Sequence, residues 1–410
     1  MKKTKHRILY IEKPAFVGGS ITGLYETIHG LDRDRFEPVV LFHGPNPYRE
    51  KFHALGVEVI VLNNDLPSGI QQVSTRDIAA SLSRFGDWLG DAYRIAKQAQ
   101  VMWRKDRPLA VRVAEIIREA KIDLIHHNNS LPGDRETIWA GKMAGIPQIS
   151  YIRVLHDFGF WERRLARSVN LFIYMSQAIE KHYLARGISA SQGRVIYDSF
   201  DLQTDIHSNH RQALRSEFGV AEQGWVISNI GRLDWWKGHE YFVEAIGQAI
   251  KSTPNIKALI VGEPDATALS QSYYQKIQEQ VQRLGLVDHV IFTGFRTDIP
   301  EIMAASDIIV HSASEPEPFG RVAVEAMTAG RPIVATAAGG ILEIVKDQET
   351  GLLVPPKDAT AMAEAIHYLS ENRERAVEMG RAGRLDAERR FSLDKHIASI
   401  QEVYEQLLGT

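Results

Sequence analysis

The stretch SEPEPFGRVAVEAMTAGRPIVAT, residues 314–336, decides the fold of the second half of the chain. An apolar run at 307–311 precedes it, and Pro316 and Pro318 then prevent regular strand pairing and stiffen a turn. Val322, Ala326 and Ala329 have the spacing of one helix face, and a second apolar run ends the stretch. Strand, turn, helix and strand in this order predict a right-handed crossover of a parallel sheet.

The same alternation extends in both directions from this stretch. Short runs that are apolar at nearly every position are typical of strands buried on both faces. These runs are residues 7–11, 38–42, 57–62, 123–126, 147–154, 171–175, 194–197, 225–230, 258–261, 289–293, 307–311 and 332–336. The pattern predicts an α/β protein with two doubly wound, Rossmann-like domains facing across a cleft. Ligands of such sheets bind at the carboxyl ends of the strands.

The predicted domain limits follow from the polar and turn-rich segments. We expect an N-terminal domain over residues 1–203, a C-terminal domain over 204–392, and a final helix over 393–410 that crosses back to the N-terminal domain. Residues 75–121 predict one or two long helices with no strand between them, which we interpret as a helical insertion in the first domain.

Composition excludes several classes of protein. The 410 residues are 44% hydrophobic and 24% charged, with a net charge of −3, which is ordinary globular composition. No cysteine is present, so thiolate nucleophiles, disulfides and cysteine metal sites are excluded. The basic start has too short an apolar run for a signal peptide, and no stretch is long enough to cross a membrane. We therefore expect a cytoplasmic protein.

Two motifs place candidate ligand-binding groups at strand ends. Gly320 stands where the helix of the first motif begins, and a helix start offers free N–H groups to an anion. Glu317 and Glu325 flank this point and are suited to binding sugar hydroxyls. In the second motif, NIGRLDWWKGHEYFVEAI at 229–246, Arg232 and Lys237 lie on a loop after a strand, where they are able to clamp a diphosphate.

Together these motifs resemble those of retaining glycosyltransferase family four. The resemblance rests on the pattern Glu-Pro-Phe-Gly-x4-Glu at 317–325, on the glycines and glutamate that follow it at 330–351, and on Gly-Arg-Leu-x3-Lys-Gly at 231–238. It is continuous from about residue 195 to 408 and looser before that. It implies the GT-B fold, a nucleotide-diphosphate-sugar donor, and transfer with no bound metal or other cofactor.

The resemblance also implies roles for individual residues. Glu317 would bind the donor sugar, Glu325 would bind the ribose, and Arg232 and Lys237 would neutralise the diphosphate. His156, at a strand end of the first domain, would face the donor sugar and completes the catalytic set with Glu317, Arg232 and Lys237. The residues expected to bind the donor are Gly18, Gly19, Arg232, Lys237, Phe319, Gly320, Arg321, Glu325, Gly294, Phe295 and Arg296.

The acceptor side offers two weaker features. Asn128, Asn129 and Ser130 follow a strand and are equally consistent with acceptor binding and with a plain loop. Residues 84–121 carry nine basic against five acidic groups, interleaved with aromatic residues. Such a segment either lies on an anionic membrane surface or packs on the domain with its cations in solvent. It contributes to the charge asymmetry of the chain, because residues 1–200 hold 28 basic and 21 acidic groups.

The sequence thus predicts a retaining, metal-independent hexosyltransferase. We expect its acceptor to be a glycan or a lipid-linked glycan of cell-surface polysaccharide or glycolipid synthesis, and we expect no nucleic-acid partner. A position at the inner face of the membrane is consistent with residues 84–121. The alternatives are a sugar-nucleotide epimerase on the same fold and a non-catalytic nucleotide-sugar-binding protein. The motifs do not distinguish among donor bases, including UDP and GDP.

Overall fold

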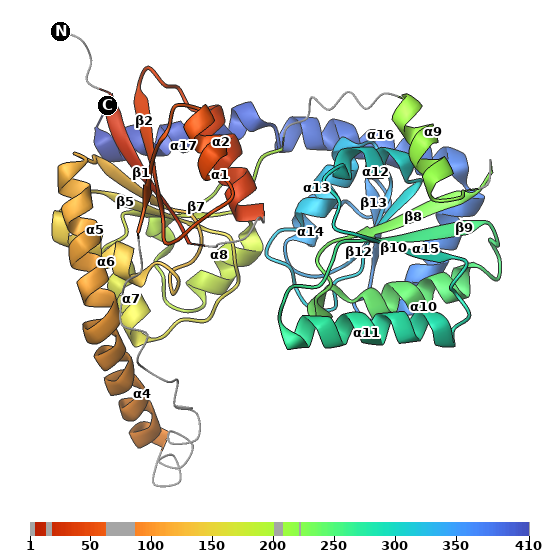
Figure 1. Ribbon diagram of the computed structural model, residues 1–410, viewed down its shortest axis with the longest axis horizontal. Helices are drawn as coiled ribbons and strands as arrows, with labels where there is room; N and C mark the ends of the chain where they lie inside the picture. Colours follow the sequence, from red (N-terminus) through yellow and green to blue (C-terminus); the bar gives the residue numbers. More distant parts are fainter. Residues whose placement is uncertain (1–4, 14–18, 63–86, 201–207, 221–222, 410) are drawn as a thin grey trace. The chain divides into compact units, whose positions relative to one another are not determined.

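The computed structural model describes residues 5–13, 19–62, 87–200, 208–220 and 223–409. The chain forms two compact units (Figure 1). The first comprises Met1–Tyr197 with His396–Thr410, and the second comprises Asp198–Lys395. The domain boundary expected at 203/204 lies in residues 201–207, outside the described residues.

The first unit is built on a seven-stranded parallel sheet with the order β3-β2-β1-β4-β5-β6-β7. Helices α1 (Gly19–His29), α2 (Arg49–Ala54), α6 (Arg135–Ala144), α7 (Phe160–Ala166) and α8 (Gln177–Leu184) connect its strands. The strands are β1 (His6–Glu12), β2 (Phe36–Phe42), β3 (Glu58–Val61), β4 (Leu124–His127), β5 (Gln148–Ile152), β6 (Leu171–Tyr174) and β7 (Gly193–Val195). Four consecutive residues of β1, from Ile8 to Ile11, are fully buried, as expected of a central strand covered on both faces.

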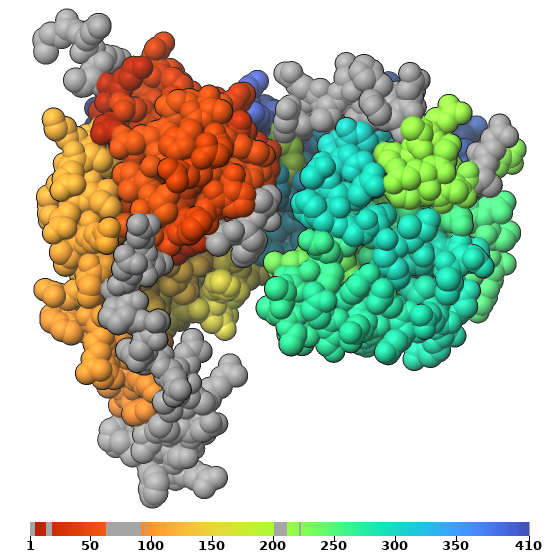
Figure 2. All heavy atoms as spheres, viewed as in Figure 1, coloured from red at the N-terminus to blue at the C-terminus, as the bar shows by residue number. Residues whose placement is uncertain are grey.

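The stretch expected to form an insertion is helical throughout its described part. It comprises α4 (Asp87–Val101), a π-helical segment η1 (Met102–Asp106) and α5 (Arg107–Glu119). Buried residues of α5, among them Val113 and Ile117, share a hydrophobic core with Leu9 and Val39 of the sheet. Helix α5 therefore belongs to the layer that covers the sheet between β3 and β4. Figure 2 shows the outer faces of these helices on one flank of the unit.

The last helix, α17 (Leu393–Leu408), packs mainly within the first unit. The hydroxyl of Tyr404 lies 2.6 Å from Nδ1 of His126 and 2.9 Å from the hydroxyl of Tyr10. The side chain of His396 lies 3.2 Å from Thr27 of α1. Buried hydrogen bonds of this kind fix the helix against β1 and β4.

The second unit contains a six-stranded parallel sheet with the order β10-β9-β8-β11-β12-β13. The strands are β8 (Trp225–Ile230), β9 (Ile256–Val261), β10 (Val290–Gly294), β11 (Ile308–His311), β12 (Ile333–Thr336) and β13 (Gly351–Val354). The helices are α9 (Ser208–Glu217), α10 (His239–Ala249), α11 (Ala268–Arg283), α12 (Ile299–Ala305), α13 (Arg321–Thr328), α14 (Ile341–Ile344), α15 (Ala359–Glu371) and α16 (Arg373–Arg390). The two sheets confirm the predicted α/β class with two Rossmann-like domains.

One strand was not among the predicted runs. Strand β13 is only four residues long and begins with a glycine, which is typical of a turn rather than a strand. The structure gives the reason for this glycine, because a Cβ on Gly351 would lie 2.6 Å from Cγ2 of Ile333 on β12. Close approach of the two backbones therefore requires the residue that weakens the sequence signal.

None of the described helices combines the length and the hydrophobicity that are needed to cross a membrane.

Candidate active site

The candidate site of the second unit lies at the carboxyl ends of β8 and β11, which pair in the middle of the sheet. After β8 the chain forms the short 3-10 turn η3 (Trp235–Lys237), and after β11 it passes through Glu317 to the start of α13. Because parallel neighbours end at the same edge, Lys237 and Glu317 meet although 80 positions separate them.

Glu317 is the centre of this site, and its side chain is only 7% exposed. Its Oε1 atom forms an ion pair with Nζ of Lys237 and lies 3.1 Å from Nε2 of His311. Burial alone would raise the pKa of Glu317, but Lys237 and His311 outweigh it and hold the pKa well below its usual value. Within the described part of the chain, no group donates a hydrogen bond to Oε2, which leaves this oxygen able to accept from a ligand hydroxyl.

The loop that carries Lys237 is fixed against the extension of β11. Oγ of Ser312 donates to the carbonyl of Lys237 at 2.8 Å and accepts from Nδ2 of Asn229 at 2.7 Å. Gly238 has a φ of +66°, and a Cβ there would lie 2.2 Å from the carbonyl oxygen of Ser312. Nζ of Lys237 also lies 4.3 Å from the centre of the Trp236 ring. The ammonium group is therefore held in place before any ligand binds.

Arg232, the second predicted cation, is less constrained. Its side chain is 43% exposed, and its Nε lies 2.6 Å from Oδ2 of Asp234. No hydrogen bond or ion pair joins this guanidinium to Glu317 among the described residues. Its charge is therefore available at the surface of the same loop, with part of it balanced by the neighbouring aspartate.

The start of α13 brings the remaining predicted residues of this motif together. Gly320 caps the helix with a φ of +104°, and no side chain caps its first turn. Arg321 forms an ion pair with the fully buried carboxylate of Asp198 and lies 3.8 Å from Oε1 of Glu325. Glu325 is about one third exposed; burial raises the pKa of its carboxyl group, against the opposing charge of Arg321.

Phe319 differs from the other residues of the motif. Its side chain is 1% exposed and packs against the rings of Phe200 and Phe391. The aromatic ring therefore anchors the start of α13 in the core, and the residue as a whole is buried.

The predicted donor-binding residues Gly294, Phe295 and Arg296 lie at the end of β10, at the same edge of the sheet. Gly294 ends the strand, and the Phe295 side chain is 62% exposed. Arg296 is already paired, with Asp298 at 2.6 Å and with Glu217 at 2.9 Å. The exposed ring, rather than the guanidinium, is the group of this segment that is free to contact a base.

In the first unit, the predicted acceptor residues follow β4 and lie beside Glu12, the last residue of β1. Asn128 is fully buried, and its Nδ2 donates to Oε2 of Glu12 at 2.5 Å, while Asn129 lies 3.3 Å from Oε1 of the same carboxylate. Burial raises the pKa of Glu12, and the two asparagines oppose this shift. The hydroxyl of Ser130 accepts from the backbone N–H of Gly133. These contacts show Asn128 and Ser130 engaged within the protein, and Asn129 as the more open side chain.

Gly18, Gly19 and His156 are the other predicted residues of the first unit. Gly18 lies outside the described residues, whereas Gly19 is the exposed first residue of α1. His156 is exposed on the loop after β5, and its carbonyl oxygen lies 3.1 Å from Nε2 of His182. Partial burial lowers the pKa of His156, although Asp157 opposes the shift.

His311, Asp198 and Glu12 are candidate site residues that the sequence analysis missed. His311 is the last residue of β11, in a run that was predicted as a strand, and it has the strand-end position that marked the other candidates. The strand-end position of His311 could therefore have marked it as a candidate site residue from the sequence alone. Glu12 is likewise the last residue of β1 and had the same signal, whereas Asp198 follows β7 at a distance and had none.

The described residues contain no cluster of three or more histidine and carboxylate side chains that could hold a metal ion. The charged groups at the edge of the second sheet include one buried carboxylate with its basic partners, the exposed Arg232 and the Arg321 pair. This arrangement is suited to an anionic ligand that also carries hydroxyl groups.

The comparisons with known proteins agree with this arrangement. A family model described as "Glycosyl transferases group 1" matches residues 210–386, and one described as "Glycosyl transferase 4-like domain" matches residues 18–198. The two matches together span most of both units. The chain belongs to the group 1 glycosyl transferases.

Its relatives and structural neighbours agree with this assignment. The N-acetyl-alpha-D-glucosaminyl L-malate synthase of Bacillus anthracis is 25% identical over 315 residues, 74% of this chain and 80% of that protein. The lipopolysaccharide core biosynthesis mannosyltransferase LpsB of Rhizobium meliloti is 31% identical over 184 residues, 44% of this chain and 52% of that protein. The crystal structure of Anabaena HepE in complex with UDP has a TM-score of 0.80, with 27% identity over 98% of this chain and all of that one.

These findings confirm the family and the GT-B fold that the motifs indicate. The chain is a glycosyltransferase that uses a nucleotide-sugar donor, with two Rossmann-like sheets of seven and six strands.

One buried histidine beside the site predicts a pH dependence of stability. His239, the first residue of α10, is fully buried, and neither ring nitrogen has a partner among the described residues. Burial lowers its pKa from 6.5 to about 3. Below pH 6.5 the unfolded chain takes up a proton that the folded chain refuses, so this residue makes the protein less stable as the pH falls toward 3.

Replacing this histidine with leucine should remove that dependence. Relative to wild type, the free energy of unfolding of His239→Leu should rise by up to about 1.4 kcal/mol for each pH unit below 6.5, and not change with pH above it. Urea unfolding at neutral and mildly acidic pH measures this difference. A difference that stays constant across the acid range would contradict the buried, neutral state of the ring.

Proposed function

We propose that this glycosyltransferase moves a hexosyl group from a UDP-sugar to a hydroxyl of a glycan or lipid-linked glycan, with retention of the anomeric configuration. The observation that carries the proposal is the buried Glu317, held by Lys237 and His311 at the edge of the second sheet. UDP is favoured as the carrier because HepE, the solved neighbour at 26–27% identity, is described with UDP and with UDP-glucose. A cell-surface acceptor is supported by LpsB, which is a mannosyltransferase of lipopolysaccharide core biosynthesis.

The proposed roles follow from the charges of the site. Lys237 and Arg232 neutralise the diphosphate as it leaves, together with the uncapped start of α13. The free Oε2 of Glu317 accepts a hydroxyl of the donor sugar, and Glu325 accepts from the ribose. Since no side chain of the site is placed as a nucleophile, we propose that the acceptor attacks the face from which the diphosphate departs and gives its proton to a diphosphate oxygen. These residues require no metal for that step.

The proposal also places the enzyme at the cytoplasmic face of a membrane. The segment 84–121 is the proposed contact with anionic lipid, supported by Trp103, which is 62% exposed, and by Arg107, whose guanidinium lies 4.6 Å from the ring of Trp103. The interleaved aromatic residues at 85–93 lie largely outside the residues whose side chains are described.

Donor binding and transfer test the proposal together. UDP should stabilise the protein against thermal unfolding by about 2.7 kcal/mol at a concentration one hundred times its dissociation constant, and GDP and ADP should do so less. With UDP-glucose and UDP-N-acetylglucosamine, mass spectrometry should detect a glycosylated acceptor or slow release of free sugar. Equal stabilisation by GDP would overturn the choice of carrier.

Replacing Glu317 with glutamine should lower turnover by about a hundredfold while UDP still binds, because the amide keeps the shape but loses the charge that orients Lys237. Glu315→Gln is the matched control, since Glu315 is two residues earlier and pairs only with the exposed Lys357. If an epimerised nucleotide sugar accumulates instead, the protein is an epimerase. Binding without turnover in wild type would make it a nucleotide-sugar-binding protein.

A further inference from the structure

A second cationic site lies in the first unit, at the opposite edge of its sheet from Asn128. The pocket is lined by residues near the amino ends of β5 and β6 and has a volume of about 490 Å³. Its lining comprises Gly141, Lys142, Gly145, Ile146, Gln148, Arg164, Arg167 and Ser168. An adjoining pocket of about 330 Å³ shares Arg164 and Arg167 and adds Arg163. No acidic side chain lines either pocket.

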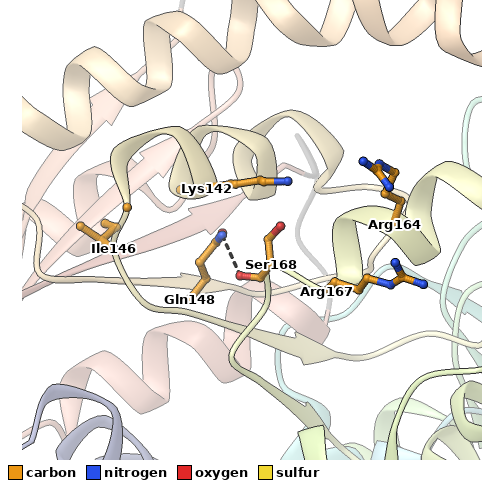
Figure 3. A pocket seen from close by; sticks show the side chains of 8 residues that line it. Lys142, Ile146, Gln148, Arg164, Arg167 and Ser168 are labelled. Carbon is orange, nitrogen blue, oxygen red and sulfur yellow. Dashed lines mark hydrogen bonds between the residues drawn. The ribbon is translucent and has the colours of Figure 1, made fainter.

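The floor of this pocket is a built part of the fold. The buried Nε2 of Gln148 donates to the carbonyls of Ile138 and Ser168, each at 3.1 Å, and so ties α6 to the turn before β6. Helix α6 approaches this amide closely, because a Cβ on Gly141 would lie 2.4 Å from Oε1 of Gln148. Figure 3 shows the hydrogen bond between Gln148 and Ser168 beneath the cationic side chains.

The cations above this floor have no partner in the part of the chain that the structure describes. Lys142, Arg164 and Arg167 are exposed, and none of them has a hydrogen bond or ion pair to a described residue through its side chain. In Figure 3 the charged end of Lys142 points toward the side of the pocket where Arg164 and Arg167 lie. By contrast, Arg135 of the same unit pairs with both Asp106 and Glu162.

We propose that this pocket is a second anion site, which binds a phosphate group of a ligand other than the sugar donor. Like charges that line one pocket repel one another, and a bound dianion removes that repulsion. Guanidinium groups bind phosphate through paired hydrogen bonds, and the lysine and the serine hydroxyl add further donors. The phosphate belongs either to a soluble phosphorylated glycan or to a lipid headgroup, and the pocket chemistry is the same for both.

Pyrophosphate titration tests this site without interference from the proposed donor site. The background variant carries Arg232→Gln and Lys237→Gln, and isothermal titration calorimetry measures its dissociation constant for pyrophosphate. Adding Arg164→Gln and Arg167→Gln should weaken binding by about tenfold or more, because two charge-assisted contacts are lost. Adding Arg283→Gln and Arg381→Gln is the matched control. These two arginines are exposed on the second unit, have no ion pair with a described residue, and change the net charge equally.

Vesicle sedimentation then separates the two sources. If the phosphate is a lipid headgroup, a larger fraction of the wild type than of the Arg164→Gln, Arg167→Gln variant should sediment with vesicles of phosphatidylcholine and phosphatidylglycerol. If equal fractions of the two proteins sediment, and the pocket substitutions still weaken pyrophosphate binding, the ligand is a soluble one. Unchanged pyrophosphate binding in the pocket variant would overturn the proposal, and the cations would then only complement the carboxyl ends of α6 and α7.

Discussion

Replacing Lys237 with methionine is expected to lower transfer turnover by about a thousandfold, the upper range for removing one preorganised charge from a transition state. The same change should lower the free energy of unfolding by about 3 kcal/mol, because it breaks a buried ion pair and leaves the other charge behind. The side chains of Lys237 and Glu317 are 20% and 7% exposed, so solvent compensates little for the loss.

A control lysine and a double variant make this result specific. Lys357 pairs with Glu315 at 2.8 Å, but both side chains are largely exposed, so Lys357→Met should change stability by less than about 1 kcal/mol. Combining Lys237→Met with Glu317→Gln should recover part of the stability and none of the activity. Chemical denaturation measures stability and a product assay measures turnover. Similar losses of stability and turnover in both lysine variants would show that the buried pair has no special role.

The sequence predicts most of the fold because the central strands are buried on both faces. Runs such as residues 8–11 are apolar at every position, and no helix surface or exposed strand produces that pattern. The prediction fails where packing overrides local pattern. Gly351 begins a strand because β12 approaches it closely.

The candidate site could be predicted only in part, for a related reason. Lys237 and Glu317 each follow a strand, so their proximity follows from the topology of a parallel sheet once both strands are assigned. The partners that set their charge states are not fixed by topology. Whether His311 faces the carboxylate, or whether Phe319 is turned into the core, depends on side-chain packing that the local sequence does not encode.

Replacing Gly238 with alanine adds only one methyl group but is expected to lower both the free energy of unfolding and the turnover strongly. Gly238 and Gly285 have nearly the same backbone, with φ of +66° and +69°, so alanine introduces the same left-handed strain at both. At Gly285 nothing lies within 4 Å of the added Cβ, whereas at Gly238 the carbonyl oxygen of Ser312 lies 2.2 Å away. The two variants therefore differ in the clash alone.

Gly285→Ala should lower the free energy of unfolding by about 1 kcal/mol, which is the conformational term, and leave turnover unchanged. Gly238→Ala should lower it by more than about 3 kcal/mol and reduce turnover by at least about a hundredfold, because the loop must move off β11 and carries Lys237 with it. Urea unfolding and the transfer assay measure both quantities on both proteins. If the two alanine variants lose equal stability and both keep full activity, the close packing of the lysine loop on Ser312 is not what positions the charge that transfer requires.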